Sequence, residues 1–244
     1  MRKPTLRGPK LNLSVKNTLL SLNHDLDLVV SRIREANETN RVIYEHSHSN
    51  HDLNFTNLQV CVLYLEDRRF FDHVGVEARA PARVIKRLLL GKRLGGISTI
   101  DQQLVRIYTN RRERTLGRKL RETLLAVFIN FRLTKHQIFH AYLHDSYFGY
   151  KLNGCEIASR HIFKKDAIYL SEEQAAFLAS LLPLPLPKSV WELCHDNGFP
   201  KDCEPENIIS HPEVRDSKWA QRVFHRYQYA KRAYAFKPRS RRRR

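Results

Sequence analysis

The sequence predicts an all-α, mostly helical protein, and three observations support this fold class. Apolar residues recur at helical spacing in several separate stretches, as in the leucine-rich residues 16–37. Two stretches open with a capping-box signal, Thr134 with Gln137 and Ser171 with Gln174. No series of segments shows the apolar–polar alternation that marks strands. With 244 residues and 42% hydrophobic content, the chain can bury the core of one sizeable domain or two small ones.

The first part of the chain predicts two helices joined by a polar loop. Residues 1–15 contain two prolines and a glycine and are expected to be disordered. A helix is predicted over residues 16–37, and the Asn- and His-rich residues 37–54 predict a loop or linker. A second, buried helix is predicted over residues 57–71, because its apolar run is almost continuous before a charged end.

The middle and the end of the chain predict further helices that stop at glycine or proline. Residues 80–94 combine aliphatic and basic side chains and end at Gly95 and Gly96, which stop a helix. The next helix is expected over residues 99–108. Three more helices are expected over residues 134–143, 171–182 and 217–235.

Residues 115–133 predict the most regular helix, with two distinct faces. At about 100° per residue, five apolar side chains gather on one side, which is expected to face the core. Arg118, Lys119 and Glu122 then cluster on the opposite side, where they are expected to face solvent or a ligand. The apolar five are Leu120, Leu124, Val127, Phe128 and Phe131.

The net charge of +18 points to an anionic partner, which can be a nucleic acid, an anionic membrane surface or a phosphorylated substrate. The arginine run at residues 241–244 is expected to be a solvated tail. No stretch is long and apolar enough to span a membrane, and residues 11–30 are interrupted by charges and do not form a signal peptide. The cysteines show no metal spacing, although Cys194 and Cys203 could pair across a loop.

The most informative stretch is residues 66–75, which follows the apolar run 58–65 and reads E-D-R-R-F-F-D-H-V-G. A carboxylate beside apolar surface suits proton transfer, but a Glu-Asp-Arg cluster alone is usually a helix end entering a loop. The full spacing, E-D-R-x-F-x-x-H-x-G, is far more specific. It resembles the first motif of the peptidoglycan glycosyltransferases (glycosyltransferase family 51), the transglycosylase domains of penicillin-binding proteins and the monofunctional transglycosylases.

Two further motifs follow in the order of that family. Residues 96–103 read G-I-S-T-I-D-Q-Q and resemble G-G-S-T-I-T-Q-Q, with Ile97 and Asp101 as departures. The N–H groups at the start of the helix that follows can face an anion. Arg106 stands where the family has a lysine, and residues 118–122 match R-K-x-x-E in full. Without the first motif, residues 96–103 would be interpreted as the start of an ordinary capped helix, and residues 118–122 as a surface Arg–Glu ion pair.

The resemblance continues to about residue 190. Residues 135–144 are similar to K-x-x-I-L-E-x-Y-L-N, except that His140 replaces Glu and His144 replaces Asn, which is expected to alter packing or hydrogen bonding. Residues 154–165 match a fifth motif in part. The chain is therefore divided into a partly disordered N-terminal extension (1–57), a family 51-like domain (58–190) and a C-terminal extension with the basic tail (191–244).

The resemblance implies a lysozyme-like, mostly helical fold with a small membrane-facing subdomain. It implies inverting polymerisation of lipid II into β-1,4 glycan strands with release of undecaprenyl pyrophosphate. Glu66 would be the general base, and Glu122 would assist catalysis. No cofactor is required for certain, and Mg²⁺ or Mn²⁺ at Glu122 is left open. The residues implied to bind substrate are Asp67, Arg68, Ser98, Thr99, Gln102, Gln103, Arg106, Arg118 and Lys119.

The implied partners are lipid II, the growing lipid-linked glycan, an anionic membrane surface and other cell-wall synthesis proteins, with no nucleic acid expected. The implied location is bacterial, peripheral at the outer, periplasmic face of the cytoplasmic membrane. Residues 80–94 are the candidate membrane contact, because aliphatic side chains stand among Lys and Arg there, which is the composition of an interfacial helix. Two alternatives stay open: a non-catalytic homologue that acts as a cell-wall scaffold, and a basic helical protein that binds nucleic acid.

Overall fold

The computed structural model describes residues 13–45, 55–77, 98–111, 113, 115–195 and 204–235, and the fold is mostly helical, as the sequence predicts. The only sheet in these ranges is a pair of short antiparallel strands, β1 (Tyr147–Gly149) and β2 (Leu152–Asn153). The helices are α1 (Leu13–Glu45), α2 (Asn57–Glu66), α4 (Ile100–Thr109), α5 (Leu116–Arg132), α6 (Lys135–Asp145), α7 (Cys155–Phe163), α8 (Glu172–Ser180), α9 (Lys188–His195), α10 (Pro205–Ser210) and α11 (Lys218–Ala230), with 3₁₀ turns at Phe70–Asp72, Ala167–Tyr169 and Lys231–Ala235.

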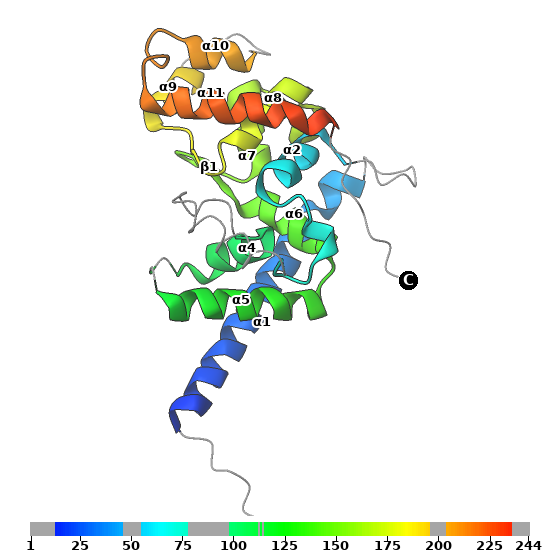
Figure 1. Ribbon diagram of the computed structural model, residues 1–244. Helices are drawn as coiled ribbons and strands as arrows, with labels where there is room; N and C mark the ends of the chain where they lie inside the picture. Colours follow the sequence, from blue (N-terminus) through cyan, green and yellow to red (C-terminus); the bar gives the residue numbers. More distant parts are fainter. Residues whose placement is uncertain are drawn as a thin grey trace, which may run out of the picture.

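The helices are arranged in layers, as Figure 1 shows. α11 lies across α8 at one end, α6 and α7 occupy the middle, and α4, α5 and α1 form the other end. The centre of the core is α8, where every residue from Gln174 to Ser180 is buried. Its small alanines allow α2 and α11 to pack closely against it.

Side-chain caps fix where several helices begin. Thr134 with Gln137 starts α6 and Ser171 with Gln174 starts α8, and both capping boxes predicted from the sequence are confirmed. A third box starts α2, where Thr56 accepts from the backbone of Gln59. These caps satisfy backbone N–H groups that would otherwise lack partners, so the loops enter the helices at defined residues.

The first helix is longer than predicted. α1 runs from Leu13 to Glu45, so the loop predicted from residue 37 onward is wrong as far as residue 45. Its buried side chains, Val29, Val30 and Ile33, recur at helical spacing and pack towards α5 and α6. Asn37, where the loop was predicted to begin, is held in the helix because its side chain donates to the carbonyl oxygens of Ile33 at 2.7 Å and of Gln137 in α6 at 3.0 Å.

The core-facing side predicted for residues 115–133 is wrong. In α5, the apolar side chains Leu120 and Phe131 are 62% and 74% exposed, and Leu124 and Phe128 are also exposed. The buried side consists of Glu122, Leu125, Ala126, Ile129 and Asn130. The backbone of this side packs closely against the first motif: a Cβ on Gly75 would lie 2.2 Å from the carbonyl oxygen of Ala126, so position 75 needs a glycine.

Both terminal parts pack on the helices between residues 58 and 190. α1 contacts α4, α5 and α6, and α11 contacts α2 and α8. Several sequence predictions fall outside the described residues, namely the segment 80–94, Gly95, Gly96, Ile97, Cys203 and the arginine tail. Among the helices that the structure does describe, none combines the length and the apolar character needed to cross a bilayer.

Candidate active site

Glu122 lies at the centre of a cation cluster between α4 and α5. Arg106 forms a fork with it, with Nη2 2.9 Å from Oε1 and Nε 3.1 Å from Oε2. Lys119 Nζ lies 2.7 Å from Oε1, and Arg118 pairs with Oε2. Because the Glu122 side chain is only 3% exposed, these three cations compensate for a carboxylate that is almost removed from water.

The electrostatics of this cluster lower the pKa of Glu122. Burial alone would raise this pKa, because it disfavours the charged carboxylate. Hydrogen bonds from Arg106 and Lys119, together with their charges, outweigh burial and hold the pKa below its usual value. Glu122 is therefore an anion at neutral pH, and three cations around one anion leave a formal surplus of two positive charges.

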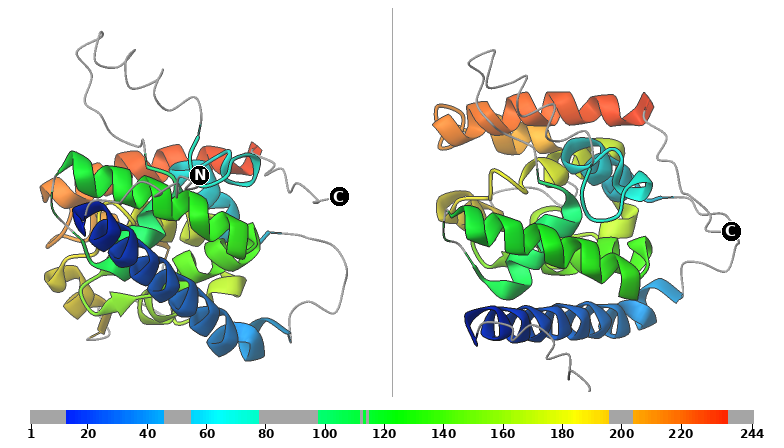
Figure 2. Two further views of the ribbon diagram at one scale, coloured as in Figure 1. Left: turned by 90° about the horizontal axis from the view of Figure 1, so that it is seen from below. Right: turned by 60° about the horizontal axis from the view of Figure 1, so that its bottom comes forward.

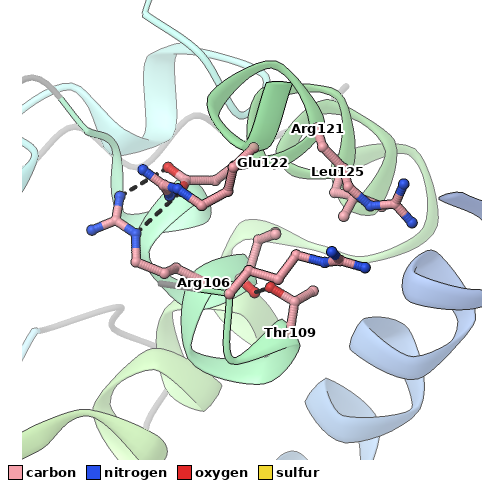
Figure 3. A pocket seen from close by; sticks show the side chains of 8 residues that line it. Arg106, Thr109, Arg121, Glu122 and Leu125 are labelled. Atoms are coloured by element: carbon pink, nitrogen blue, oxygen red, sulfur yellow. Dashed lines mark hydrogen bonds and ion pairs between the residues drawn. The ribbon is translucent and has the colours of Figure 1, made fainter. Parts of the chain in front are cut away.

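Arg106, Arg118 and Glu122 also line a small pocket of about 10 Å³ between α4 and α5, drawn in Figure 3. Arg106 reaches across to Glu122, whereas Arg121 points away from it towards α1 and bonds to Asp25. The pocket therefore has cations on two sides: Arg106 and Arg118 are held by Glu122, whereas Arg121 is held by Asp25. The four arginines that line it are Arg106, Arg111, Arg118 and Arg121.

The second motif supplies further donors to this cluster. Ser98 Oγ accepts from Lys119 Nζ at 3.0 Å and from Arg106 at 3.4 Å. Gln102 accepts from the same Lys119 Nζ at 2.9 Å and donates to Thr123 at 3.1 Å. The structure therefore brings together Ser98, Gln102, Arg106, Arg118, Lys119 and Glu122, which the sequence placed in two separate motifs.

Glu66, the candidate base, lies at the last residue of α2 with a side chain 12% exposed. Its Oε2 accepts from Gln103 at 3.0 Å, and its Oε1 pairs with Arg226 of α11. Gln103 in turn accepts from the buried Tyr142 hydroxyl at 2.9 Å. Each oxygen of the Glu66 carboxylate is therefore fixed by a different helix.

α4 connects the two carboxylates. Its neighbouring residues Gln102 and Gln103 bond respectively to the cation cluster and to Glu66. Thr99 caps this helix and donates to the Gly75 carbonyl at 2.7 Å, which ties the second motif to the first. The positions of the base candidate and of the cations are thus set by one rigid ten-residue helix.

A buried polar network supports the loop behind Glu66. Asp67 Oδ2 lies 2.9 Å from His73 Nε2 and accepts from the backbone of Ile100 at 3.3 Å. Asp101, one of the departures from the family motif, is fully buried and paired with Lys135 at 2.8 Å. It also accepts from Asn130 at 2.7 Å. The charge that Asp101 introduces is thus compensated within the core.

Other predicted substrate-binding residues lie in different surroundings. Asp67 and Thr99 are buried and bonded within the protein, so a contact of their side chains with substrate stays a prediction. Arg68 is exposed, lies over the ring of Tyr64 with 3.8 Å to the centroid, and pairs with the Tyr229 hydroxyl. It lies two residues after Glu66 in sequence and, like Glu66, contacts α11.

His140 and His144, the other departures from the family pattern, line a cavity of about 380 Å³ formed by α1, α6, β2 and α7. Burial lowers the pKa of His140 to about 4. The pKa of His144 is raised instead, because its ring hydrogen-bonds to Asp145 at 2.9 Å. Both histidines are thus integrated into local packing and hydrogen bonding.

The donor set around Glu122 does not fit a divalent metal ion. Both of its oxygens already accept hydrogen bonds from cations, and Mg²⁺ and Mn²⁺ prefer several oxygen ligands. In the described ranges, the one group of potential ligands close enough for a metal is Asp67, His73 and Asp101. Lys135 Nζ already contacts both oxygens of that Asp101, at 2.8 and 2.9 Å.

The sequence did not reveal the contribution of α11. Arg226 and Tyr229 come from residues 191–244, which carry no motif that the sequence analysis could assign, and both lie against the first motif. A contact over 160 residues of sequence separation leaves no local spacing signal. Tyr142, by contrast, was recognisable as a motif position, but its bond to Gln103 depends on the packing of α6 against α4.

The fold and the site define a mostly helical protein in which one helix, α4, bonds both to the Glu66 carboxylate and to a cluster of lysine and arginine around Glu122. The chain belongs to the transglycosylase family, whose sequence model matches residues 31–195. Its relatives include the biosynthetic peptidoglycan transglycosylase of Alcanivorax borkumensis, 37% identical over 129 residues, which are 52% of this chain and 53% of that protein.

Two further relatives match this chain at similar sequence identity. The biosynthetic peptidoglycan transglycosylase of Thiobacillus denitrificans is 31% identical over 153 residues, 62% of this chain and 66% of that protein. Penicillin-binding protein 1A of Rickettsia typhi is 33% identical over 138 residues, 55% of this chain and 17% of that much longer protein. The chain thus matches 53% of the Alcanivorax protein and a smaller part of the penicillin-binding protein.

Proposed function

We propose that this protein is a peptidoglycan glycosyltransferase that polymerises lipid II into β-1,4 glycan strands and releases undecaprenyl pyrophosphate. The relatives named peptidoglycan transglycosylases support this assignment, as does the match of the transglycosylase family to residues 31–195. The expected location is peripheral, at the outer face of the bacterial cytoplasmic membrane. Lipid II and the growing lipid-linked glycan would be its substrates.

One observation carries the proposal: adjacent residues of α4 hold Glu66 and the cation cluster in fixed relation. Gln103 bonds to Glu66, and Gln102 bonds to Lys119. A glycosyl transfer from a pyrophosphate donor needs a base at the attacking hydroxyl and positive charge at the leaving group. The rigid helix between them supplies this arrangement without any substrate present.

In the proposed reaction, the 4-hydroxyl of the acceptor sugar attacks C1 of the donor from the face opposite the pyrophosphate. The O4–C1 bond forms, the bond from C1 to the pyrophosphate oxygen breaks, and the configuration at C1 inverts. Glu66 accepts the hydroxyl proton. Arg106, Arg118 and Lys119 stabilise the leaving pyrophosphate, because they carry more positive charge than Glu122 neutralises.

Glu122 has a positioning role in this proposal. It holds the three cations together before substrate arrives, since like charges this close would otherwise repel one another. Pyrophosphate can then take the place of Glu122 in part of the contacts with Lys119. The Lys119 side chain is 36% exposed, about as much as that of Arg106 at 38% and more than that of Arg118 at 17%. Lysine and arginine, rather than a metal ion, supply the positive charge.

The test is incubation of the full chain with lipid II in detergent, followed by detection of glycan polymer. Polymer is expected from the wild type, and Glu66→Gln is expected to lower the rate by roughly 10²–10⁴ because it cannot accept the proton. Asp72→Asn is the matched control, since this carboxylate belongs to the same motif but pairs with Arg69 at 3.6 Å, whereas Glu66 pairs with Gln103 and Arg226. Wild-type rates from Glu66→Gln would refute the role of Glu66.

The scaffold alternative predicts a different result from the same preparations. A non-catalytic homologue would bind a lipid-linked glycan analogue but form no polymer from lipid II. Ligand binding by the wild type together with the absence of polymer would therefore favour a scaffold. Absence of both would leave the cation cluster without a substrate and reject the proposed function.

A further inference from the structure

The outer face of α5 carries an apolar stripe that nothing in the described part of the chain covers. Its exposed fractions are 90% for Leu116, 62% for Leu120, 38% for Leu124, 36% for Phe128 and 74% for Phe131. No other described helix or turn exposes more than two large apolar side chains. A Cβ on Gly117 in the first turn would also meet nothing within 4 Å.

This stripe is continuous along the helix. The first four residues follow one another at intervals of four, and Phe131 lies within the same arc of about 120°. Figure 2 shows α5 lengthwise at the surface, with α1 crossing beside it. Large apolar surfaces of this kind usually mark an interaction with a protein or a membrane.

The charges around the stripe favour an anionic surface. The only acidic residue of α5 is Glu122, which is buried on the other side and pairs with Arg118 and Lys119. Arg121 and Arg132 pair with Asp25 and Asp27 of α1, so these four cations of α5 exceed the acids they share by one charge. Arg121 bonds to Ser21 and Asp25, so the start of α1 lies next to α5. Leu19 and Leu20, 52% and 61% exposed, extend the apolar surface there.

The size of the stripe argues against a second copy of this chain. α5 has 17 residues and is about 25 Å long, and one row of side chains is about 10 Å wide. This face would bury only a few hundred Å², whereas each partner in a stable complex buries roughly 800 Å². A bilayer has no such requirement, because it accommodates an amphipathic helix lying in its surface.

We propose that the outer face of α5, from Leu116 to Phe131, is a membrane-binding surface that lies in the headgroup region of an anionic bilayer. Leu19 and Leu20 at the exposed start of α1 flank it, where α1 projects beyond α5 in Figure 1. Interfacial helices bury their apolar face about 5–10 Å deep.

This placement connects the surface to the site, and that connection rests on the proposed function. A helix with its side chains is about 10–12 Å across. Arg118 and Lys119 extend from the opposite side of α5 and would therefore lie at about the height of lipid phosphates. The pyrophosphate of a membrane-anchored donor occupies that level, so it could reach the cations without leaving the bilayer surface.

The experiment is flotation of the full chain with phosphatidylglycerol vesicles, without lipid II. The wild type is expected to float, and Phe128→Ser/Phe131→Ser is expected to bind about tenfold more weakly or worse. The control Ile157→Ser/Tyr169→Ser also removes two exposed apolar side chains, 54% and 71% exposed on α7 and the following turn. It is expected to float like the wild type.

Two measurements keep the result interpretable. The thermal transition shows whether the stripe variant stays folded, and Phe131→Ser alone, at a side chain 74% exposed, repeats the flotation test if the loss of Phe128, which is 36% exposed, lowers that transition. Equal flotation of wild type and stripe variant, or no flotation of the wild type, would overturn the inference. A wild-type dimer that the stripe variant dissociates would also overturn it, by assigning the stripe to a protein interface.

The membrane surface and the proposed function can fail separately. Polymer formation in detergent does not require a bilayer, so the stripe variant should keep its activity there if the inference is right. Reduced flotation with no polymer from any variant would keep the membrane surface and reject the glycosyltransferase. Normal polymer formation, together with equal flotation of the wild type and the stripe variant, would keep the glycosyltransferase and reject the membrane surface.

Discussion

Glu122 is a charged side chain that the protein buries, and it can be buried because three cations surround it. An unpaired carboxylate in the core would cost several kcal/mol, and partners that donate charge-assisted hydrogen bonds offset this cost. The same arrangement makes the cations interdependent, since each of Arg106, Arg118 and Lys119 bonds to this one carboxylate. Removing Glu122 therefore affects the whole cluster, whereas removing Lys119 leaves two arginines on it.

We predict that Glu122→Gln lowers the free energy of unfolding by about 2–4 kcal/mol at neutral pH, because three cations lose their counter-charge. Glu122 has a pKa below 4.5 in the folded protein, so its contribution is present above 4.5 and is lost as the pH falls through the folded pKa. Urea unfolding at several pH values should show this acid loss in the wild type and not in the variant.

The exposed Glu192 supplies the control for this measurement. It forms a solvent-exposed pair with Lys188 at 3.4 Å, and such pairs contribute about 0–1 kcal/mol. Glu192→Gln should therefore leave both the stability and its acid dependence nearly unchanged. An equal loss from the two substitutions would contradict the central role of Glu122.

At the scale of single elements, α5 shows what a sequence pattern can and cannot predict. The 3.6-residue period identified the helix and separated Glu122 from the leucine stripe. The period could not decide which face would be buried, because both faces contain enough apolar residues to pack. Tertiary packing decided it: the small and medium side chains Leu125, Ala126 and Ile129 fit against the neighbouring helices.

We predict that the two faces of α5 respond oppositely to truncation. Leu125→Ala and Ile129→Ala should each lower the free energy of unfolding by about 2–4 kcal/mol, because each leaves a cavity in the core. Phe131→Ala should change it by less than about 0.5 kcal/mol, since the side chain is 74% exposed. Urea denaturation of the three variants measures this difference, and a larger loss from Phe131→Ala would mean that the stripe is covered.

The candidate site was predictable only in part, because local sequence patterns do not reveal how separate helices pack. Local motifs predicted Glu66 and the residues around Glu122, because each motif keeps its spacing within one helix or turn. They did not predict that Asp101 pairs with Lys135, or that Arg226 reaches Glu66, because these contacts depend on how separate helices pack. Asp101 stands out in the sequence as a departure, but its compensation by Lys135 and Asn130 is visible only in the fold.

The link between α11 and α2 predicts a measurable coupling. Glu66 is 12% and Arg226 is 24% exposed, so their ion pair is largely shielded from water. In a double-mutant cycle with Glu66→Gln and Arg226→Gln, we expect a coupling energy of about 1–3 kcal/mol in the free energy of unfolding. Arg222, an exposed arginine of the same helix, is the control: Arg222→Gln should show no coupling with Glu66→Gln. A coupling near zero would show that α11 does not hold the Glu66 carboxylate in solution.

At the scale of the whole molecule, the stability of the fold depends on pH through titratable groups on different helices. Burial lowers the pKa values of His136 and His140 on α6, whereas the hydrogen bond to Asp145 raises that of His144. The lowered histidines weaken the fold as pH falls, and His144 weakens it as pH rises above 6.5. Glu122 acts only below 4.5. The interval between 4.5 and 6.5 is therefore governed mainly by the histidines with lowered pKa values.

This interval gives a prediction for His140. Its pKa is about 4 in the folded protein against 6.5 for an unperturbed histidine, so the unfolded chain binds a proton first as pH falls from 6.5 to 4. The free energy of unfolding should fall over this range by on the order of 2 kcal/mol from His140. In His140→Gln, which cannot titrate, this part of the fall should disappear, whereas the exposed His225→Gln should keep it. Urea unfolding between pH 7 and pH 4 measures the slopes, and an unchanged slope in His140→Gln would mean that its ring is protonated as readily in the fold as in the unfolded chain.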